Sequence, residues 1–217
     1  NTGPRDETTG SMYGRSACGT TVSVLLARLR ARRHRRSFPH GRPAPEGRTI
    51  AIIEVRDLVA ADHAAVLALN NSATPHVNEL STGEFAWIVS HEDYFRVAEA
   101  EAGLAAFVIA LRPGLEYWSL NYRWFSERGG DFLYLDRIVV HERARGTGVG
   151  RAMYDDIDRF ASGRWPCITL EVNLLPPTPG SLAFHERLGF RRVGVREEEG
   201  GAKAVALMER PVSPPQL

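Results

Sequence analysis

The segment from Phe132 to Met153 constrains the fold most, because a strand pattern, a glycine-rich turn and a helix pattern follow one another there. Residues 132–140 are apolar and rich in β-branched side chains, which predicts a largely buried strand. The turn contains the sequence Arg145-Gly-Thr-Gly-Val-Gly-Arg151. An apolar helical face follows it, formed by Met153, Ile157 and Phe160.

This arrangement predicts an anion site. Glycines accept positive φ angles and let the backbone approach a ligand closely, so successive N–H groups can point at one phosphate. The unpaired amides and the dipole of the helix N-terminus strengthen such a site. We therefore expect a phosphate or pyrophosphate ligand at this turn.

The glycine spacing excludes two common phosphate loops. A P-loop needs Gly-x-x-x-x-Gly-Lys-Ser/Thr, whereas Gly146 is followed five residues later by Arg151, with no Lys or Ser/Thr behind it. A dinucleotide loop needs Gly or Ala at the sixth position, which is Arg151 counted from Gly146 and Met153 counted from Gly148. The pattern that fits is Gln/Arg-x-x-Gly-x-Gly/Ala, with its defining positions at Arg145, Gly148 and Gly150.

That pattern resembles the coenzyme A pyrophosphate loop of the GNAT-superfamily N-acyltransferases. A second segment, Ser181-Leu-Ala-Phe-His-Glu-Arg-Leu-Gly-Phe190, is similar to the family's Ser-Leu-x-Phe-Tyr-x-Lys-Leu-Gly-Phe. Between the two, residues 167–172 have a strand pattern, which predicts a βαβ unit with a parallel connection. The resemblance covers roughly residues 50–211, although its motifs lie in the second half.

The resemblance implies the GNAT fold, an α/β architecture (α+β in some schemes). Its mixed, mostly antiparallel sheet of about seven strands has a splayed central parallel pair and flanking helices. The predicted order is β-α-α-β-β-β-α-β-α-β-β. Strands are expected at 50–55, 94–98, 104–111, 132–140, 167–172, from 190 and at 204–208. Helices are expected at 62–69, after an N-cap at Thr82, after the glycine turn and at 181–188.

Charge is distributed unevenly along the chain. Residues 1–48 carry ten arginines and three acidic residues, a net charge of +7, and the remainder carries −6. We expect 1–48 to be a basic, disordered extension, 49–211 the acetyltransferase domain and 212–217 a C-terminal tail. A third functional hypothesis is nucleic-acid binding through the arginines of the extension. A solvated extension is the favoured interpretation, so neither a nucleic-acid partner nor a membrane partner is expected.

The remaining composition is that of one globular domain. With 217 residues and 43% hydrophobic content, the chain can bury one substantial core. No apolar run approaches the ~18 residues of a membrane-spanning helix. Cys18 and Cys167 lie far apart and form no disulfide framework, which fits a reducing cytoplasm.

The resemblance further implies acetyl-CoA as co-substrate, no metal, and direct attack by an amine in a ternary complex. The bulged strand would pair with pantetheine through the backbone of Ile138, Val139 and Val140, with one amide polarising the thioester carbonyl. The pyrophosphate would lie on the amides of Arg145, Gly146, Thr147, Gly148, Val149, Gly150 and Arg151. Thr178 stands where the family has an Asn that contacts the co-substrate, and Asn173 is a possible substitute.

The second motif departs from the family at His185, which replaces the Tyr that often protonates the leaving thiolate. An imidazolium with a pKa of ~6.5 could do so at neutral pH. The alternative is a helix histidine without a chemical role. Candidate bases are Tyr134 and Asp136, which share a strand face, and Glu171 on the next strand. A carboxylate among apolar residues has a raised pKa, which suits a base, whereas Asp136 could instead pair with Arg137.

The acceptor is predicted only by class, as a small-molecule or peptide amine. The loop 115–125 contains five aromatic residues and would cover the acceptor pocket, with Asn121 and Arg123 as polar contacts. Asn78 and Glu79 would line the opposite wall. The alternatives for this loop are packing against the sheet or a contact between two copies of the chain. The sequence is therefore compatible with a homodimer as well as with a monomer. The alternative function is a non-catalytic acyl-CoA-binding or sensing module.

Overall fold

The structure is a computed structural model, and it describes residues 53–100 and 103–213. The predictions for residues 1–48, for the beginning of a first strand at 50–52 and for the end of the C-terminal tail lie outside the described residues.

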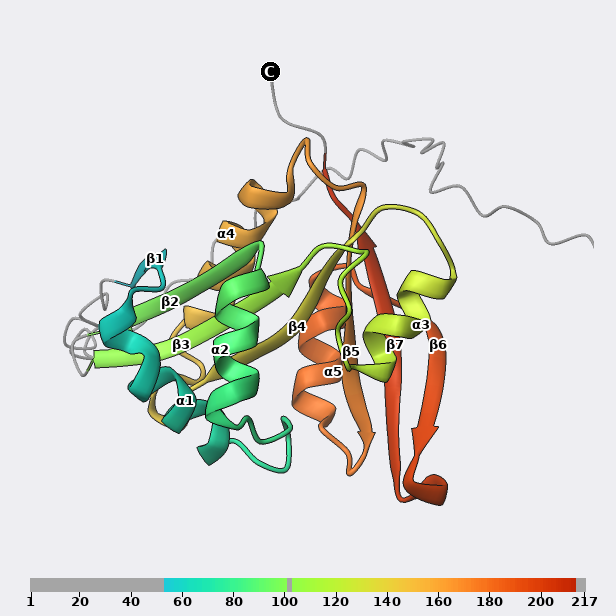
Figure 1. The fold of residues 1–217 in the computed structure, drawn as a ribbon, viewed down its shortest axis with the longest axis horizontal. Helices are drawn as coiled ribbons and strands as arrows, with labels where there is room; N and C mark the ends of the chain where they lie inside the picture. Colours follow the sequence, from blue (N-terminus) through green and yellow to red (C-terminus); the bar gives the residue numbers. More distant parts are fainter. Residues whose placement is uncertain (1–52, 101–102, 214–217) are drawn as a thin grey trace, which may run out of the picture. The chain divides into compact units, whose positions relative to one another are not determined.

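Seven strands of the described ranges form one mixed sheet. They are β1 (Glu54–Asp57), β2 (Tyr94–Ala100), β3 (Gly103–Leu111), β4 (Leu133–Val140), β5 (Cys167–Leu175), β6 (Arg191–Glu198) and β7 (Lys203–Pro211). Their spatial order is β1-β2-β3-β4-β5-β7-β6 (Figure 1). All neighbours are antiparallel except β4 and β5, which are parallel. The predicted sheet with a central parallel pair is thereby confirmed.

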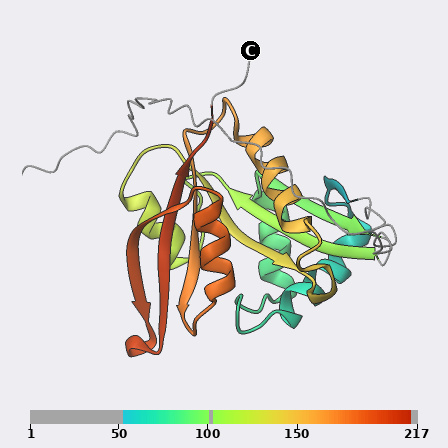
Figure 2. The ribbon, with the colours of Figure 1, turned by 180° about the vertical axis from the view of Figure 1, so that it is seen from behind.

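The helices divide between the two faces of the sheet. They are α1 (His63–Ser72), α2 (Thr82–His91), α3 (Leu120–Glu127), α4 (Val149–Ala161) and α5 (Pro179–Arg187). Figures 1 and 2 show α1, α2 and α3 on one face and α4 and α5 on the other. Two clusters of buried side chains correspond to these faces, one containing the apolar residues of α4 and the other those of α1 to α3.

Two helix starts differ from the sequence-based prediction. The helix α2 is capped by Ser81 instead of Thr82, because Ser81 and Glu84 form a reciprocal capping box: the Ser81 hydroxyl accepts from the Glu84 amide and the Glu84 carboxylate accepts from the Ser81 amide. The predicted loop 115–125 is wrong in its second half, where α3 forms. Ser119 caps this helix by accepting a hydrogen bond from the Tyr122 amide.

The strand β4 bulges and then separates from β5. In the ladder with β3, Arg137 faces Ile109 and Leu135 faces Ala110, so Asp136 is the extra residue. The ladder between β4 and β5 has only two register pairs, Leu133 with Ile168 and Tyr134 with Thr169. Beyond Tyr134 the two strands diverge, and this gap positions the site.

Candidate active site

A cavity of about 1000 Å³ lies where β4 and β5 diverge. Residues 135–140 and 170–173 of the two strands line it, together with the turn before α4 and the beginning of α5. Its other walls are the segment between α1 and α2 and residues 117–121 before and within α3. The cavity therefore has one end at the glycine-rich turn and another between α2 and α3.

The glycine-rich turn has the backbone that its sequence predicts. Gly146 and Gly148 have φ angles of 76° and 100°, which favour glycine strongly, and Gly148 is the N-cap of α4. Five of its seven residues line the cavity, namely Arg145, Gly146, Gly148, Gly150 and Arg151. A Cβ on Gly150 would lie 3.5 Å from the Phe184 ring, so α4 and α5 approach closely here. Thr147 and Val149 lie outside the lining, and the Val149 side chain packs in the core.

The two arginines of the turn have protein partners. The Arg151 Nε donates to Asp155 at 2.7 Å in an exposed pair one helical turn along α4. The Arg145 Nε donates to the Val140 carbonyl at 3.4 Å. In the predicted anion site, the backbone and the helix N-terminus would therefore be the fixed part, and the arginine side chains would add charge at its edge.

The predicted pantetheine segment, Ile138 to Val140, lines the cavity. It pairs with β3 on one side and, among the described residues, with no strand on the other. On the opposite wall the Thr178 hydroxyl donates to the Asn173 carbonyl at 2.9 Å, and the Asn173 amide donates to the His76 carbonyl at 2.9 Å. Both residues line the cavity, but their side-chain donors are used within the protein.

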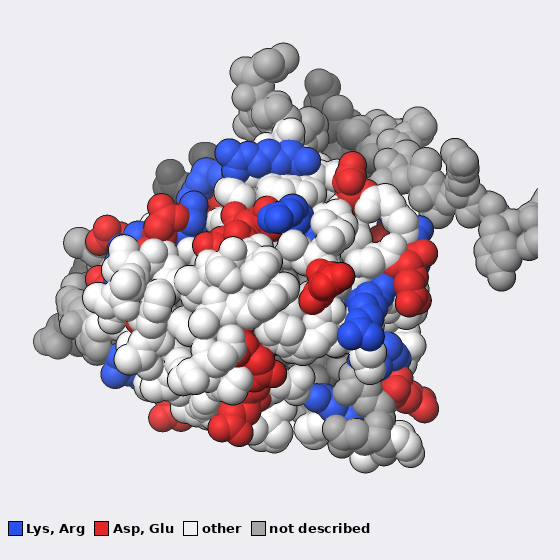
Figure 3. Space-filling model, in the orientation of Figure 1, with Lys and Arg blue, Asp and Glu red and all other residues white. Residues whose placement is uncertain are grey.

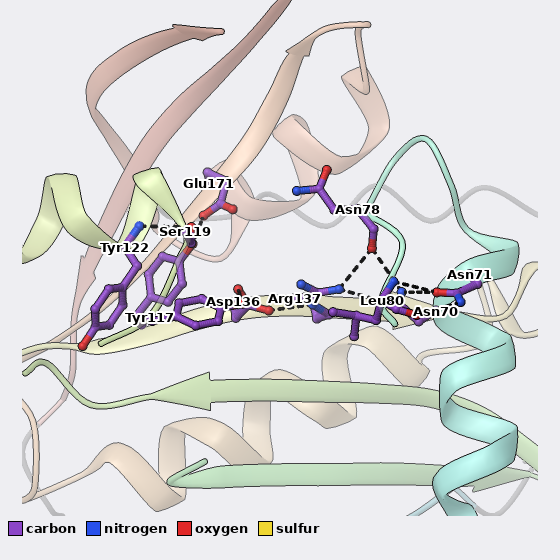
Figure 4. A network of polar contacts seen from close by, with 11 residues as sticks. Asn70, Asn71, Asn78, Leu80, Tyr117, Ser119, Tyr122, Asp136, Arg137 and Glu171 are labelled. Carbon is purple, nitrogen blue, oxygen red and sulfur yellow. Dashed lines mark hydrogen bonds and ion pairs between the residues drawn. The ribbon is translucent and has the colours of Figure 1, made fainter. Parts of the chain in front are cut away.

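Two carboxylates lie at the start of the gap, Asp136 on β4 and Glu171 on β5, and both line the cavity (Figure 4). Burial, followed by the charge of Asp136, raises the pKa of Glu171 from 4.5 to about 7, although hydrogen bonds from Tyr134 and Asn121 oppose this. Asp136 accepts from the Tyr117 hydroxyl at 2.7 Å and from the Arg137 Nε at 2.6 Å. The carboxylate of Glu171 is therefore held at the proton affinity that a general base needs near neutral pH.

Tyr134 has a different position from the predicted one. It is fully buried and lies outside the cavity lining, while its hydroxyl donates to Glu171 at 2.8 Å. Burial, together with the charges of Glu171 and Asp136, raises its pKa well above 10. Tyr134 thus stays a hydrogen-bond donor to Glu171, which argues against its predicted role as a base. Tyr134 packs in the cluster formed with α1 to α3, which also contains Tyr117, the residue that donates to Asp136; of Tyr134 and Asp136, only Asp136 lines the cavity.

His185 lines the cavity but is 5% exposed, and both its ring nitrogens are occupied. Its Nδ1 lies 2.8 Å from the Ser181 carbonyl and its Nε2 2.7 Å from the Tyr154 hydroxyl. Because a carbonyl only accepts, Nδ1 carries the proton and Nε2 accepts from Tyr154. Burial lowers the pKa of His185 below 6.5. This geometry argues against the predicted imidazolium and favours the alternative of a structural histidine.

The end of the cavity lined by residues 76–80 and 117–121 is the one that the sequence predicts for the acceptor, and it is called the acceptor end below. Asn78, Glu79 and Asn121 line the cavity as expected, as do Tyr117 and Trp118, whereas Arg123 does not. The remaining aromatic residues of this segment pack elsewhere: Tyr122 and Phe125 are buried, and Trp124 packs against Gly194.

Arg137 lines the cavity and also donates to the buried Asn70 of α1, a contact that the sequence did not indicate. An arginine within an apolar strand was the only available signal for Arg137. The alternative that Asp136 pairs with Arg137 is confirmed by the 2.6 Å contact.

Two further properties concern only residues 53–100 and 103–213. They contain no group of three or more His, Cys, Asp or Glu side chains placed to hold a metal ion. No helix in these ranges has the length and apolar character needed to cross a membrane.

Residues 63–190 match the family model described as the Acetyltransferase (GNAT) family. The ribosomal-protein-S18-alanine N-acetyltransferase from Escherichia coli is similar in structure, with a TM-score of 0.56 and 19% identity over 76% of this chain and 97% of that chain. NAA60 from Arabidopsis thaliana in complex with a bisubstrate analogue is similar with a TM-score of 0.60 and 18% identity, over 74% of this chain and 98% of that chain. A GCN5-related N-acetyltransferase from Kribbella flavida is similar with a TM-score of 0.54 and 22% identity, over 73% of this chain and 97% of that chain. No curated protein matches the chain in sequence.

Proposed function

Because the chain belongs to the acetyltransferase (GNAT) family, we propose that it transfers the acetyl group of acetyl-CoA to a primary amine by direct attack in a ternary complex. The observation that carries this proposal is the cavity-facing carboxylate of Glu171, whose pKa is raised to about 7 at the point where β4 and β5 separate. A carboxylate of this kind can accept a proton from an amine that lies in the same cavity.

The co-substrate site has two parts. Pantetheine pairs with the backbone of Ile138, Val139 and Val140, where β4 has lost its neighbour β5, in the manner of an added strand. The pyrophosphate lies on the amides of the turn from Arg145 to Arg151 and at the N-terminus of α4. Support comes from the positive φ angles at Gly146 and Gly148 and from the lining of the cavity by both parts.

Glu171 acts as the base, directly or through one water. It removes one proton from the ammonium group, and the neutral nitrogen then forms a bond to the carbonyl carbon while the carbon–sulfur bond breaks. The second proton, lost as the amide forms, ends on the sulfur. Tyr134 and Asn121 orient the Glu171 carboxylate through hydrogen bonds. The negative charge of Asp136 helps to keep the pKa of Glu171 raised.

The acceptor is a small-molecule or peptide amine that enters between α2 and α3. Trp118, which is 37% exposed, and the side chains of Asn78 and Glu79 line that end of the cavity. On the face shown in Figure 3, acidic and basic side chains surround a largely uncharged centre. Selection of the acceptor therefore depends on the cavity walls more than on a surface field of one sign.

The test is binding of acetyl-CoA to the full chain by calorimetry, followed by thiol release with a panel of amines. We expect binding and amine-dependent release in the unaltered protein, and binding with strongly reduced release in Glu171→Gln. Binding without release for every amine would favour the alternative of an acyl-CoA-sensing module. Failure to bind acetyl-CoA would refute the proposal.

A further inference from the structure

We propose that Arg137 is a positioning residue that clamps the acceptor wall to the bulge carrying Asp136. The wall in question is the segment from His76 to Leu80, here called the strap, which connects α1 with α2. The inference rests on the proposed function, because it assigns to the strap the placement of the amine opposite Glu171.

The strap crosses from one side of the strand gap to the other. All five of its residues, from His76 to Leu80, line the cavity. On the β5–β7 side it receives two hydrogen bonds, from the Asn173 amide to the His76 carbonyl at 2.9 Å and from the Lys203 ammonium to the Asn78 side-chain oxygen at 3.0 Å. The strap therefore contacts both halves of the divided sheet, and its position fixes the width of the acceptor end.

Arg137 holds the strap from the β4 side (Figure 4). Its Nη1 donates to the Asn78 carbonyl at 3.2 Å and to the Asn70 side-chain oxygen at 2.9 Å. Asn70 is fully buried and donates in turn to the Asn78 carbonyl at 3.1 Å. Asn71 completes the clamp by bonding both backbone groups of Leu80, each at 3.0 Å.

The same guanidinium also holds Asp136, the residue whose charge helps to raise the pKa of Glu171. Its Nε donates to Asp136 at 2.6 Å, and the side chains of Arg137 and Asp136 are 7% and 4% exposed. A charge buried to this extent needs a fixed set of partners. One rigid, planar side chain thus sets the distance between the bulge and the strap, and a more flexible cation could not hold both.

The clamp can be tested without disturbing the buried ion pair, because Asn71 contacts the strap but not Asp136. In Asn71→Ala we expect the KM for the amine to rise about fivefold through the loss of the Leu80 hydrogen bonds, with the KM for acetyl-CoA unchanged. Hydrogen exchange at the amides of residues 78–80 should become faster. Arg137→Lys, which keeps the charge, should change the amine KM in the same direction.

Ser72→Ala is the matched control, because Ser72 lies beside Asn71 on α1 and its hydroxyl donates to the Leu69 carbonyl and not to the strap. It should leave the amine KM and the exchange at 78–80 unchanged. The proposal is overturned by an unchanged amine KM in Asn71→Ala, by equal increases in both KM values, or by unchanged exchange. If the unaltered protein acetylates no amine, the proposed function fails, and exchange at 78–80 alone decides whether the clamp exists.

Discussion

The two ends of the cavity are built in different ways. The turn from Arg145 to Arg151 owes its shape to backbone angles, with Gly146 and Gly148 at positive φ and the first turn of α4 immediately behind. The acceptor end owes its shape to side chains from α1, α3, β4 and β5, joined by hydrogen bonds between residues far apart in the sequence. One end is encoded by seven consecutive residues, whereas the other exists only after the whole domain has folded.

This difference determines how each end should respond to substitution. A backbone anion site tolerates the loss of individual side chains but not a change in its φ angles. A side-chain network is sensitive to the loss of a single side chain, because a buried polar group that loses its partner still carries the free-energy cost of its removal from water. Substitutions at the two ends should therefore separate acetyl-CoA affinity from turnover.

The largest effect is expected at the acceptor end, for Glu171→Gln. Removal of a general base lowers kcat by roughly 10²–10⁴-fold, whereas the acetyl-CoA dissociation constant should change little, because Glu171 lies away from the glycine-rich turn. Steady-state kinetics and calorimetry measure the two quantities. A kcat within tenfold of the unaltered protein would show that another group takes the proton.

The pH dependence should identify the same carboxylate. With a Glu171 pKa of about 7, the ionised base is lost as the pH falls below neutrality, so kcat/KM should decrease about tenfold per pH unit between pH 6 and 5. Asp136→Asn removes the second cause of the raised pKa and should move the acidic decrease in kcat/KM to lower pH. An acidic decrease at the same pH as in the unaltered protein would assign the titration to another group.

The buried carboxylate should also reduce the stability of the folded protein. Because the folded-state pKa lies above the unfolded value of 4.5, stability is lost as the pH rises from 4.5 through 7. Glu171→Gln should therefore raise the free energy of unfolding at pH 8 by up to about 3 kcal/mol, with no such gain at pH 4. Urea denaturation at the two pH values measures this. Equal changes at both would exclude the carboxylate charge as the cause.

At the other end of the cavity, Gly148→Ala should weaken acetyl-CoA binding by roughly tenfold or more, since a side chain at a φ of 100° stores ~1–3 kcal/mol of strain and shifts the amides. Gly103→Ala is the control, because Gly103 has a φ of 90° and open space around it, away from the cavity. Both variants should lose stability, but only Gly148→Ala should lose affinity. Equal affinities would contradict the backbone site.

The contrast also explains what could be predicted from the sequence. The turn and the Ser181–Phe190 segment are local patterns, so their structures follow from adjacent residues. Glu171 was recognisable as a carboxylate within an apolar strand. The pairing of Arg137 with Asn70 was not, because 66 residues separate the two in the sequence and only the folded sheet brings them together.

One error in the prediction, the missed helix α3, has a local physical cause. The helix α3 was missed because five aromatic residues suggested a covering loop, although Ser119 was a suitable N-cap. The general-acid hypothesis for His185 came from its position in the Ser181–Phe190 segment, where the family has a Tyr. The burial of His185 and its hydrogen bond from Tyr154 depend on the packing of α5 against α4, which the sequence does not specify.

His185 offers a smaller effect and a direct test of its role. If it is structural, His185→Gln should lower the free energy of unfolding by about 1–3 kcal/mol, because the Tyr154 hydroxyl and the Ser181 carbonyl lose well-placed partners. At saturating substrates kcat should then change less than tenfold, with the same pH profile on its alkaline side. A loss of more than a hundredfold in kcat with unchanged stability would restore the general-acid hypothesis.

The smallest effect should come from Arg151→Ala, although Arg151 belongs to the co-substrate motif. Its side chain is 66% exposed and pairs with Asp155, so the expected stability change is below ~0.5 kcal/mol. If backbone amides hold the pyrophosphate, acetyl-CoA affinity should fall only a few-fold, and this loss should shrink in high salt because an exposed charge is screened. A salt-independent loss of a hundredfold would mean that the arginine binds the phosphate directly. The two ends of the cavity would then be alike in depending on side chains.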